Sequence, residues 1–237
     1  MLPVLVHVEL NPVEIRDVFF DEDVAWVATS SGADVYDSDG ALLARVDNLP
    51  CSDVRVVGSY KDRLTLGTEC GAFVWNDGWK LLGRQAPVAA IVDAAVFYRS
   101  GHIYPFGNVG TPIVDAVDWR DGWAIATADG RILLDEAIVR MSAPVADLAV
   151  VDGELRVAIH TAAVTIAADG TITEGAIRAT SAGPGWGTVD GALLDDEGQR
   201  LGAVPGTVVA MAAGPEGAMV ATVDGLWMVT DHDTAAR

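Results

Sequence analysis

The sequence predicts an all-β protein, a β-propeller of seven short blades, from three observations. A phrase of Ala or Gly, then Thr, two variable residues and Gly recurs at positions 28–32, 67–71, 126–130, 187–191 and 221–225. Apolar runs flank most copies of this phrase, and turn residues separate the runs. An apolar run near the N-terminus belongs to no repeat of its own. Repetition at a regular spacing is the sequence signature of repeat architectures such as propellers.

Each copy of the phrase is interpreted as a hairpin that joins two strands. Strand-forming residues precede the Thr and follow the Gly, as in 24–27 and 34–36 of the first unit. Asp-Gly is a strong hairpin signal, since a type I′ turn needs positive φ and Gly adopts it without steric cost. It occurs at 129–130, 190–191 and 224–225. A second turn at 39–40, 77–78, 169–170 and 197–198 leads to a further strand, so each unit is predicted to be a meander of three or four strands.

The spacing of the phrase predicts the number of units. The intervals from Thr68 to Thr127 and from Thr127 to Thr188 are each long enough for two units. Diverged copies are found at 86–109 and 143–175, which gives seven units in total. All are shorter than the roughly 40 residues of a common propeller blade. A six-bladed ring with one irregular connection is the main alternative, and an open β-sandwich is the next.

Closure of the ring is expected to involve the N-terminus. The last unit contains strands at 208–211, 218–221 and 226–229, and the strand at 4–10 has no unit. A propeller leaves only short, protected sheet edges. We therefore expect the N-terminal strand to complete the last blade, within a single domain of residues 1–237.

Two segments carry a resemblance to known proteins, residues 26–32 (WVATSSG) and 220–227 (VATVDGLW). They resemble the repeat of two-component-regulator-type β-propellers, whose blades carry an aromatic-aliphatic pair, Gly-Thr, two residues and Gly-Leu. The chain as a whole also resembles a small haloarchaeal family classed only as β-propellers. These resemblances imply the fold and no activity. The membrane helix and kinase that follow the regulator propellers have no match here, so a sensing role is not implied.

The charge of the chain is strongly negative, with a formal net charge of −19 and only two lysines, Lys61 and Lys80. An acidic, lysine-poor surface around small apolar residues is expected of a protein in a salt-saturated cytoplasm, where dense screening suppresses self-repulsion. We therefore expect a halophilic archaeal source. The charge argues against nucleic acid and anionic membranes, which require clustered Lys or Arg.

The location expected from the sequence is cytoplasmic. The first residues show no basic segment followed by an apolar run, as a secretory signal requires. No segment approaches the ~18 apolar residues of a membrane-spanning helix. Cys51 and Cys70 form no CxxC pair, so buried reduced thiols are favoured over a disulfide or a metal site.

One candidate site comes from alignment of the first strand of each unit. The first five units carry an aspartate at what this alignment treats as one position: Asp17, Asp53, Asp93, Asp115 and Asp147. In a propeller these residues would form a ring at one end of the central channel. Converging carboxylates are able to bind Ca²⁺ or Mg²⁺, or a basic peptide. The alternative is structural, since such aspartates commonly accept hydrogen bonds from backbone amides of their own turn or of the next blade.

A second candidate is a partner-binding surface on the irregular third unit. It combines aromatic residues and a histidine in and shortly after a segment bounded by Gly and Pro: Tyr98, His102, Tyr104, Phe106 and Trp119. Departures from a repeat often mark binding loops, because a rigid scaffold tolerates variation there. The same residues would equally fill the space left by a diverged blade.

The function favoured by these observations is that of a non-enzymatic platform for an unidentified protein partner or ligand, without a resident cofactor. No nucleophile elbow, metal-ligand spacing or phosphate loop is recognisable. The alternative is a metal-dependent hydrolase or lactonase-like enzyme, in which the ring of aspartates would hold the ion and polarise a substrate oxygen.

Overall fold

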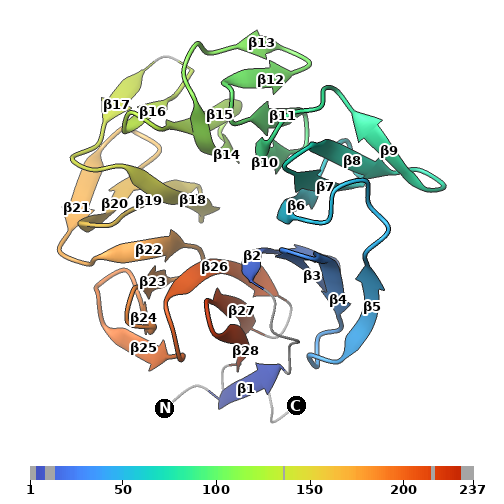
Figure 1. Cartoon of the computed structure of the whole chain (residues 1–237). Helices are drawn as coiled ribbons and strands as arrows, with labels where there is room; N and C mark the ends of the chain where they lie inside the picture. The colour runs from blue at the N-terminus through green and yellow to red at the C-terminus, as the bar shows by residue number, and fades with distance from the viewer. Residues whose placement is uncertain (1–3, 9–13, 136, 215–216, 231–237) are drawn as a thin grey trace.

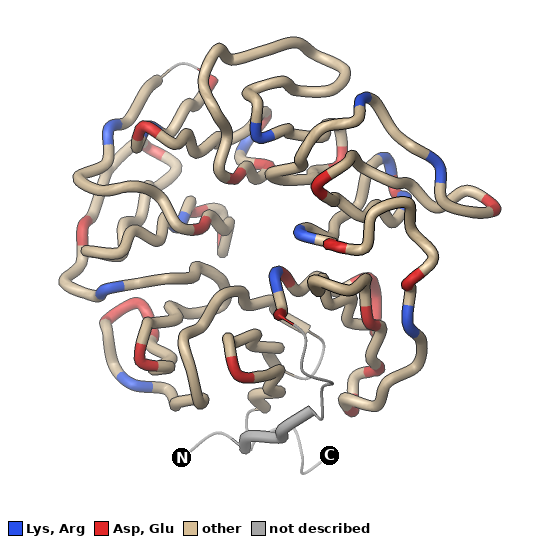
Figure 2. Tube along the Cα trace, viewed as in Figure 1, with Lys and Arg blue, Asp and Glu red and all other residues tan. Residues whose placement is uncertain are grey.

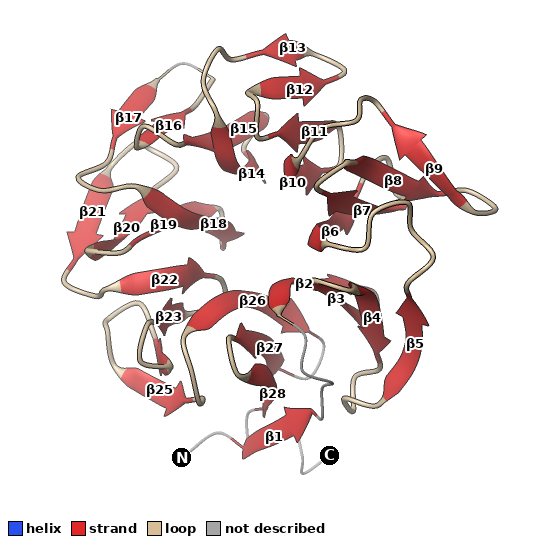
Figure 3. Ribbon diagram, viewed as in Figure 1, coloured by secondary structure: helices blue, strands red, loops and turns tan. Residues whose placement is uncertain are grey.

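Twenty-eight strands and no helices make up the part of the chain that the computed structural model describes, residues 4–8, 14–135, 137–214 and 217–230 (Figure 3). They form seven four-stranded antiparallel sheets. The sheets are arranged as blades around a central axis (Figure 1). The predicted seven-bladed propeller is confirmed, and the six-bladed ring and the β-sandwich are wrong. In the described ranges, no helix exists that could span a membrane.

Each blade is a meander that runs outward from the axis. Blade 1 comprises β2 (Ile15–Asp21), β3 (Val24–Thr29), β4 (Gly32–Tyr36) and β5 (Leu42–Val46). Blade 2 comprises β6 (Val54–Ser59), β7 (Leu64–Thr68), β8 (Gly71–Trp75) and β9 (Trp79–Leu82). Blade 3 comprises β10 (Val88–Val92), β11 (Ala95–Tyr98), β12 (His102–Tyr104) and β13 (Gly107–Asn108). Blade 4 comprises β14 (Ile113–Trp119), β15 (Gly122–Thr127), β16 (Arg131–Leu133) and β17 (Ile138–Arg140). Blade 5 comprises β18 (Val145–Val151), β19 (Glu154–Ile159), β20 (Ala162–Ile166) and β21 (Ile172–Gly175). Blade 6 comprises β22 (Ala179–Ala182), β23 (Trp186–Thr188), β24 (Ala192–Leu194) and β25 (Arg200–Ala203). Blade 7 comprises β26 (Val208–Gly214), β27 (Gly217–Thr222) and β28 (Gly225–Thr230), together with β1 (Val4–Val8).

The ring is closed by the N-terminal strand. β1 pairs with β28 in antiparallel register, with Val4 opposite Thr230 and Val8 opposite Leu226. Blade 7 is therefore built from the first strand and the last three strands, with β1 beside β28 in Figure 1. This confirms the expectation that the first strand completes the last blade.

The recurring Thr holds the turn between the second and third strands of a blade. In blade 2 the buried Thr68 hydroxyl donates to the Gly71 carbonyl (2.9 Å) and accepts from the Cys70 N–H (3.1 Å). In blade 4, Thr127 donates to Asp129 Oδ1 (2.6 Å). The hairpins are where they were predicted, but the type I′ geometry is wrong for them, since Asp129, Asp190 and Asp224 have no positive φ. A hydroxyl that bonds within the turn makes a left-handed conformation unnecessary at that aspartate.

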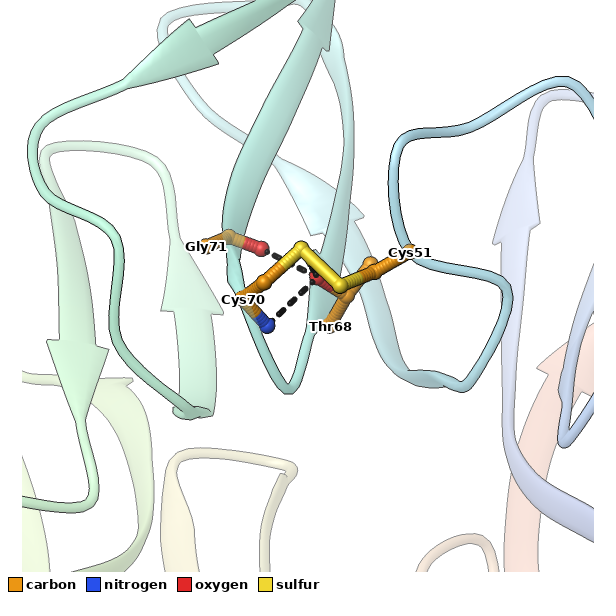
Figure 4. The surroundings of a disulfide bond; sticks show 4 residues. All are labelled: Cys51, Thr68, Cys70 and Gly71. Carbon is orange, nitrogen blue, oxygen red and sulfur yellow. Dashed lines mark hydrogen bonds between the residues drawn. A yellow bond between two sulfur atoms is a disulfide. The ribbon is translucent and has the colours of Figure 1, made fainter.

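A disulfide joins Cys51 to Cys70, so the expectation of reduced thiols is wrong. Cys51 lies in the connection between blades 1 and 2, and Cys70 lies in the turn held by Thr68 (Figure 4). The two Cα atoms are 6.1 Å apart, within the range that a disulfide spans. Sequence spacing did not reveal the pairing, because the fold brings the connection back over the turn of the next blade.

The hydrophobic core lies between neighbouring blades. The largest cluster combines the facing surfaces of blades 4 and 5, with Ile132, Leu155 and Ile159 among its fully buried members. Alanine and valine predominate close to the axis, where strands converge and large side chains do not fit. The outer ends of the blades and their turns are thereby left as the surfaces on which function can vary.

Candidate functional site

The inner strands of the blades enclose a central channel with a volume of about 450 Å³. In all seven blades the pairing of the first two strands is interrupted by a bulge at the same place. A bulge fixes which side chains face each way, because it inserts one unpaired residue. The residues that follow it form one level of the inner strands: Asp17, Val56, Ala90, Asp115, Asp147, Ser181 and Ala210.

Three of the five predicted aspartates therefore share this level: Asp17, Asp115 and Asp147. Each joins its own inner strand to that of the next blade. Asp17 accepts from Val18 N–H (2.8 Å) and from Val57 N–H of blade 2 (2.9 Å). Asp115 accepts from Ala116 N–H (2.8 Å) and from Leu148 N–H of blade 5 (2.9 Å).

Asp147 makes the same connection between blades 5 and 6. Its Oδ1 accepts from Leu148 N–H (3.0 Å), and its Oδ2 accepts from Ala182 N–H (2.9 Å) and the Ser181 hydroxyl (2.8 Å). Leu148 N–H is thus shared by two carboxyl groups, Asp115 and Asp147. Both oxygens of all three ring aspartates carry backbone donors.

The electrostatics of the ring follow from burial. Burial raises the pKa of Asp17 from 3.8 to about 7, against the lowering effect of its hydrogen bond from Val57, and the charge of Asp147 adds to the rise. Burial and the charge of Asp147 also raise the pKa of Asp115 well above 3.8. The pKa of Asp147 itself is raised by burial. At neutral pH the ring therefore carries less negative charge than three exposed aspartates would.

The ring of five is wrong in two positions. Asp53 lies just before β6, three residues ahead of Val56, and forms ion pairs with Arg16 (3.5 Å) and Arg55 (3.2 Å) at the channel. Asp93 lies in the turn after β10, beyond the opposite end of that inner strand. Within the part of the chain that the structure describes, no three His, Cys, Asp or Glu side chains converge as a metal site.

The sequence interpretation missed the arginines of the channel. Arg16 and Arg55 occupy the bulge position itself in blades 1 and 2, and Arg99 also lines the channel. Their positive charge lies beside the aspartate level. The available signal was the Arg that directly precedes Asp17, which becomes informative only once the bulge is known.

The aromatic residues of the third unit do not form one surface. Tyr98 is fully buried and bonds through its hydroxyl to Leu82 O (2.9 Å) of blade 2, and Trp119 is also buried. Tyr98 and Tyr104 pack toward blade 2, with Tyr104 6.2 Å from the Tyr60 ring. Tyr98 therefore lies outside the predicted partner surface, and Trp119 lines a separate hollow of blade 4.

His102 and Tyr104 are half-buried, and Phe106 is 60% exposed at the turn between β12 and β13. The ring of Phe106 lies 5.0 Å from that of Trp123 in blade 4. Strand alternation turns Tyr98 toward blade 2 and its neighbour Phe97 toward Trp123 of blade 4. Phe106, by contrast, lies in the turn beyond β12 and reaches Trp123 from there. Of the predicted surface, Phe106 is the side chain that projects into solvent.

Phe106 and Trp123 line a groove of about 540 Å³ on the outer ends of blades 3 and 4. We call this the blade 3–4 groove, and its lining consists of Asp93, Ala94, Phe106, Asp118, Arg120, Asp121, Gly122, Trp123 and Asp135. These residues come from the first and third turns of the two blades, which lie at the same end of an antiparallel meander. Acidic residues occur on every part of the ring (Figure 2), and here four of them surround two aromatic rings.

A smaller hollow of about 280 Å³ adjoins the groove and shares Arg120, Asp121, Trp123 and Asp135 with it. Trp119 lines this hollow, under the Arg120 guanidinium, which lies 4.1 Å from the centre of its ring. The Trp119 indole nitrogen is buried and has no hydrogen-bond acceptor among the described residues. Buried indole N–H groups usually find a partner.

Gly122 shapes the boundary between the groove and the hollow. A Cβ atom at this position would overlap the Asp135 carboxylate. The absence of a side chain at Gly122 thus lets Asp135 lie over the start of β15. This arrangement adds the Asp135 carboxylate to the lining of both the groove and the hollow.

Neither a protein-family model nor a curated protein sequence matches the chain. Among solved structures it is similar to a streptogramin B lyase, with a TM-score of 0.75 and 11% identity over 96% of this chain and 97% of that chain. It is similar to the virginiamycin B lyase of Staphylococcus aureus, with a TM-score of 0.70 and 10% identity over 97% and 99%. It is also similar to BBS1N crystallised in complex with ARL6DN, with a TM-score of 0.69 and 13% identity over 98% of both chains. At these identities the likeness concerns the fold, and the chain is a seven-bladed β-propeller.

Proposed function

We propose that this propeller is a non-catalytic platform that binds a protein partner through the blade 3–4 groove. The observation that carries the proposal is Phe106, which is 60% exposed and packs on Trp123 inside a groove. Exposed aromatic residues in a hollow surrounded by polar groups are typical of interaction sites. By contrast, Tyr98 and Phe97 of the same blade are fully buried between blades.

The state of the channel aspartates also supports a platform. A metal-dependent hydrolase would need carboxylate oxygens free to bind an ion. In Asp17, Asp115 and Asp147 both oxygens accept hydrogen bonds from the inner strands of two blades. These bonds use part of the acceptor capacity of each carboxylate and orient it toward the next blade, which leaves fewer lone pairs for an ion.

The fold does not choose between the two classes, since one fold hosts many functions. The similar structures include two lyases by name and a propeller crystallised with a partner. The choice made here depends on the channel and the groove of this chain alone.

We further propose that the platform works in the cytoplasm of a halophilic archaeon. The net charge of −19 and the two lysines support this habitat. The same charge disfavours nucleic acid and anionic membranes as partners. The Cys51–Cys70 disulfide argues in the other direction, because disulfides are uncommon in reducing cytosol. Alkylation of free thiols during lysis of the native host, followed by mass measurement, decides the redox state inside the cell.

The platform is tested by selecting random linear peptides displayed on phage against the wild-type protein. Enriched peptides should lose binding to Phe106→Ser and keep it to Leu42→Ser, a change of an equally exposed apolar residue on β5 of blade 1. Peptides that bind both variants equally, or the absence of any enrichment, would contradict binding at the groove. Dispersed NMR spectra of both variants serve as the control for folding.

A further inference from the structure

The lining of the blade 3–4 groove combines two features that together define a ligand chemistry. The first is the aromatic pair, in which Phe106 leaves most of its surface open to solvent beside Trp123. The second is charge, since the groove is lined by Asp93, Asp118, Asp121 and Asp135 against the single cation of Arg120. Faces of aromatic rings attract cations, and more strongly when carboxylates stand beside them.

The next feature is the lack of ion pairs described for the groove carboxylates. Among the described residues, none of the four groove aspartates forms a salt bridge. Asp118 accepts only a long hydrogen bond from Asp93 N–H (3.4 Å), and Asp93 accepts a similar one from Asp62 N–H (3.4 Å). Arg120 is held by Ala167 O (3.3 Å) and by the Trp119 ring. The groove therefore keeps an excess of negative charge that its own residues do not neutralise.

A further observation comes from the adjoining hollow. The indole N–H of Trp119 is a donor without an acceptor in the described structure, and the residue is only 6% exposed. A cationic side chain carries only donors and would not satisfy this N–H. A peptide carbonyl would, because it is the acceptor that accompanies every side chain of an extended segment.

We propose that the blade 3–4 groove binds an arginine side chain of a partner protein, with the guanidinium between the aromatic pair and the carboxylates of Asp121 and Asp135. The main chain of the partner segment passes the hollow and offers a carbonyl to Trp119. Arginine fits better than lysine, because its planar guanidinium stacks on rings and pairs with a carboxylate through two donors. This inference rests on the proposed function, since it specifies the partner of the same groove.

The test uses a blocked pentapeptide with one central arginine between glycines, and a second peptide with citrulline in its place. Citrulline keeps the shape of the side chain and removes its charge. Binding to the ¹⁵N-labelled protein is followed at the indole N–H signals of Trp119 and Trp123, assigned with Trp119→Phe and Trp123→Phe. We expect the arginine peptide to move both signals, and citrulline to weaken binding by about tenfold.

Three variants connect the response to the groove. Asp121→Asn combined with Asp135→Asn should weaken the arginine peptide by about tenfold, and Phe106→Ala by about threefold. Gly122→Ala should weaken it through the displaced Asp135 without changing any charge. Asp39→Asn, which removes an exposed carboxylate from the turn between β4 and β5 of blade 1, is the matched control and should leave binding unchanged.

Several outcomes would overturn the inference. If the citrulline peptide binds as tightly as the arginine peptide, the charge of the side chain has no role. If the peptide shifts other NMR signals but neither indole N–H signal, it binds outside the groove. Failure of this inference is distinguishable from failure of the platform. If displayed peptides depend on Phe106 but contain no enriched arginine, the groove is an interaction site for a different chemistry.

Discussion

Replacement of Asp17 by asparagine should change how the stability of the protein depends on pH. The carboxyl group accepts one N–H from its own strand and one from blade 2. An amide has one oxygen, so in Asp17→Asn its NH₂ group would face one of the two backbone donors. A buried donor left without an acceptor costs about 1–3 kcal/mol. The variant should therefore be less stable than the wild type in acid, where Asp17 is protonated.

The pH dependence of stability expected from Asp17 is opposite to that of a typical ion-paired aspartate. The folded-state pKa of Asp17 is about 7, above its ordinary 3.8, so the folded protein binds this proton more tightly than the unfolded chain. The free energy of unfolding therefore falls as the pH rises from about 4 to about 7 and is level above that range. A shift of this size corresponds to at most about 4 kcal/mol, at about 1.4 kcal/mol for each pH unit. Asp17 is half-buried and lines the channel, so screening by solvent reduces this value and we expect about 2–4 kcal/mol.

The assay is urea unfolding of the wild type and Asp17→Asn at a series of pH values in concentrated KCl. The advantage of the wild type over the variant should shrink by about 2–4 kcal/mol between about pH 4 and pH 8. Asp39→Asn is the control for loss of a carboxylate and should follow the wild type at every pH. Because burial is the largest cause of the shift, high salt should preserve it. Parallel stability curves for wild type and Asp17→Asn would refute the reasoning.

Four further perturbations test the fold and the channel. Thr68→Val removes the hydroxyl that bonds Gly71 O and Cys70 N–H, and should lower the free energy of unfolding by about 1–2 kcal/mol; an unchanged urea midpoint would contradict the role of the hydroxyl. Reduction of the Cys51–Cys70 disulfide, whose cysteines are 19 positions apart in the sequence, should cost about 3 kcal/mol, measured by unfolding with and without reductant. Deletion of β1 (Val4–Val8) should expose β28 and promote association in size-exclusion chromatography, whereas a monomer of unchanged stability would contradict closure by this strand. Millimolar Ca²⁺ or Mg²⁺ should not raise Tm relative to an equal ionic strength of KCl, and a specific rise would favour the metal-dependent alternative.

Much of the fold could be predicted because the repeat records local geometry. The buried Thr68 hydroxyl requires a Thr at one place, and the positive φ of Gly71 favours glycine three residues later. These constraints act within a single turn, so they appear in the sequence as a fixed spacing. The closing strand was also predictable, because 4–10 had no partner in its own unit.

The candidate sites were less predictable because they depend on register and on packing between blades. Asp17 and Asp53 both precede a valine near the start of an inner strand, yet the bulge places Asp17 three residues further along than Asp53. Nothing in the local sequence marks where the bulge falls. In blade 3, Tyr98 lies in strand β11 and packs toward blade 2, whereas Phe106 lies in the turn after β12 and packs on Trp123 of blade 4. An aromatic cluster in the sequence therefore became two groups in space.

The distribution of polar groups at the bulge level explains why the channel and the groove have different roles. Asp17, Asp115 and Asp147 each connect two adjacent blades, and in blade 6 the Thr180 hydroxyl connects to Val208 O (2.8 Å) of blade 7. Each of these polar side chains near the bulge uses its hydrogen-bonding groups to connect its own blade to the next one. The groove carboxylates of Asp93 and Asp118 each accept one long hydrogen bond (3.4 Å) from a neighbouring blade, in place of the two short backbone bonds that each ring aspartate accepts. The aspartates at the axis therefore hold the ring together through hydrogen bonds to the next blade, whereas we propose that the negative charge of the groove is available for a ligand.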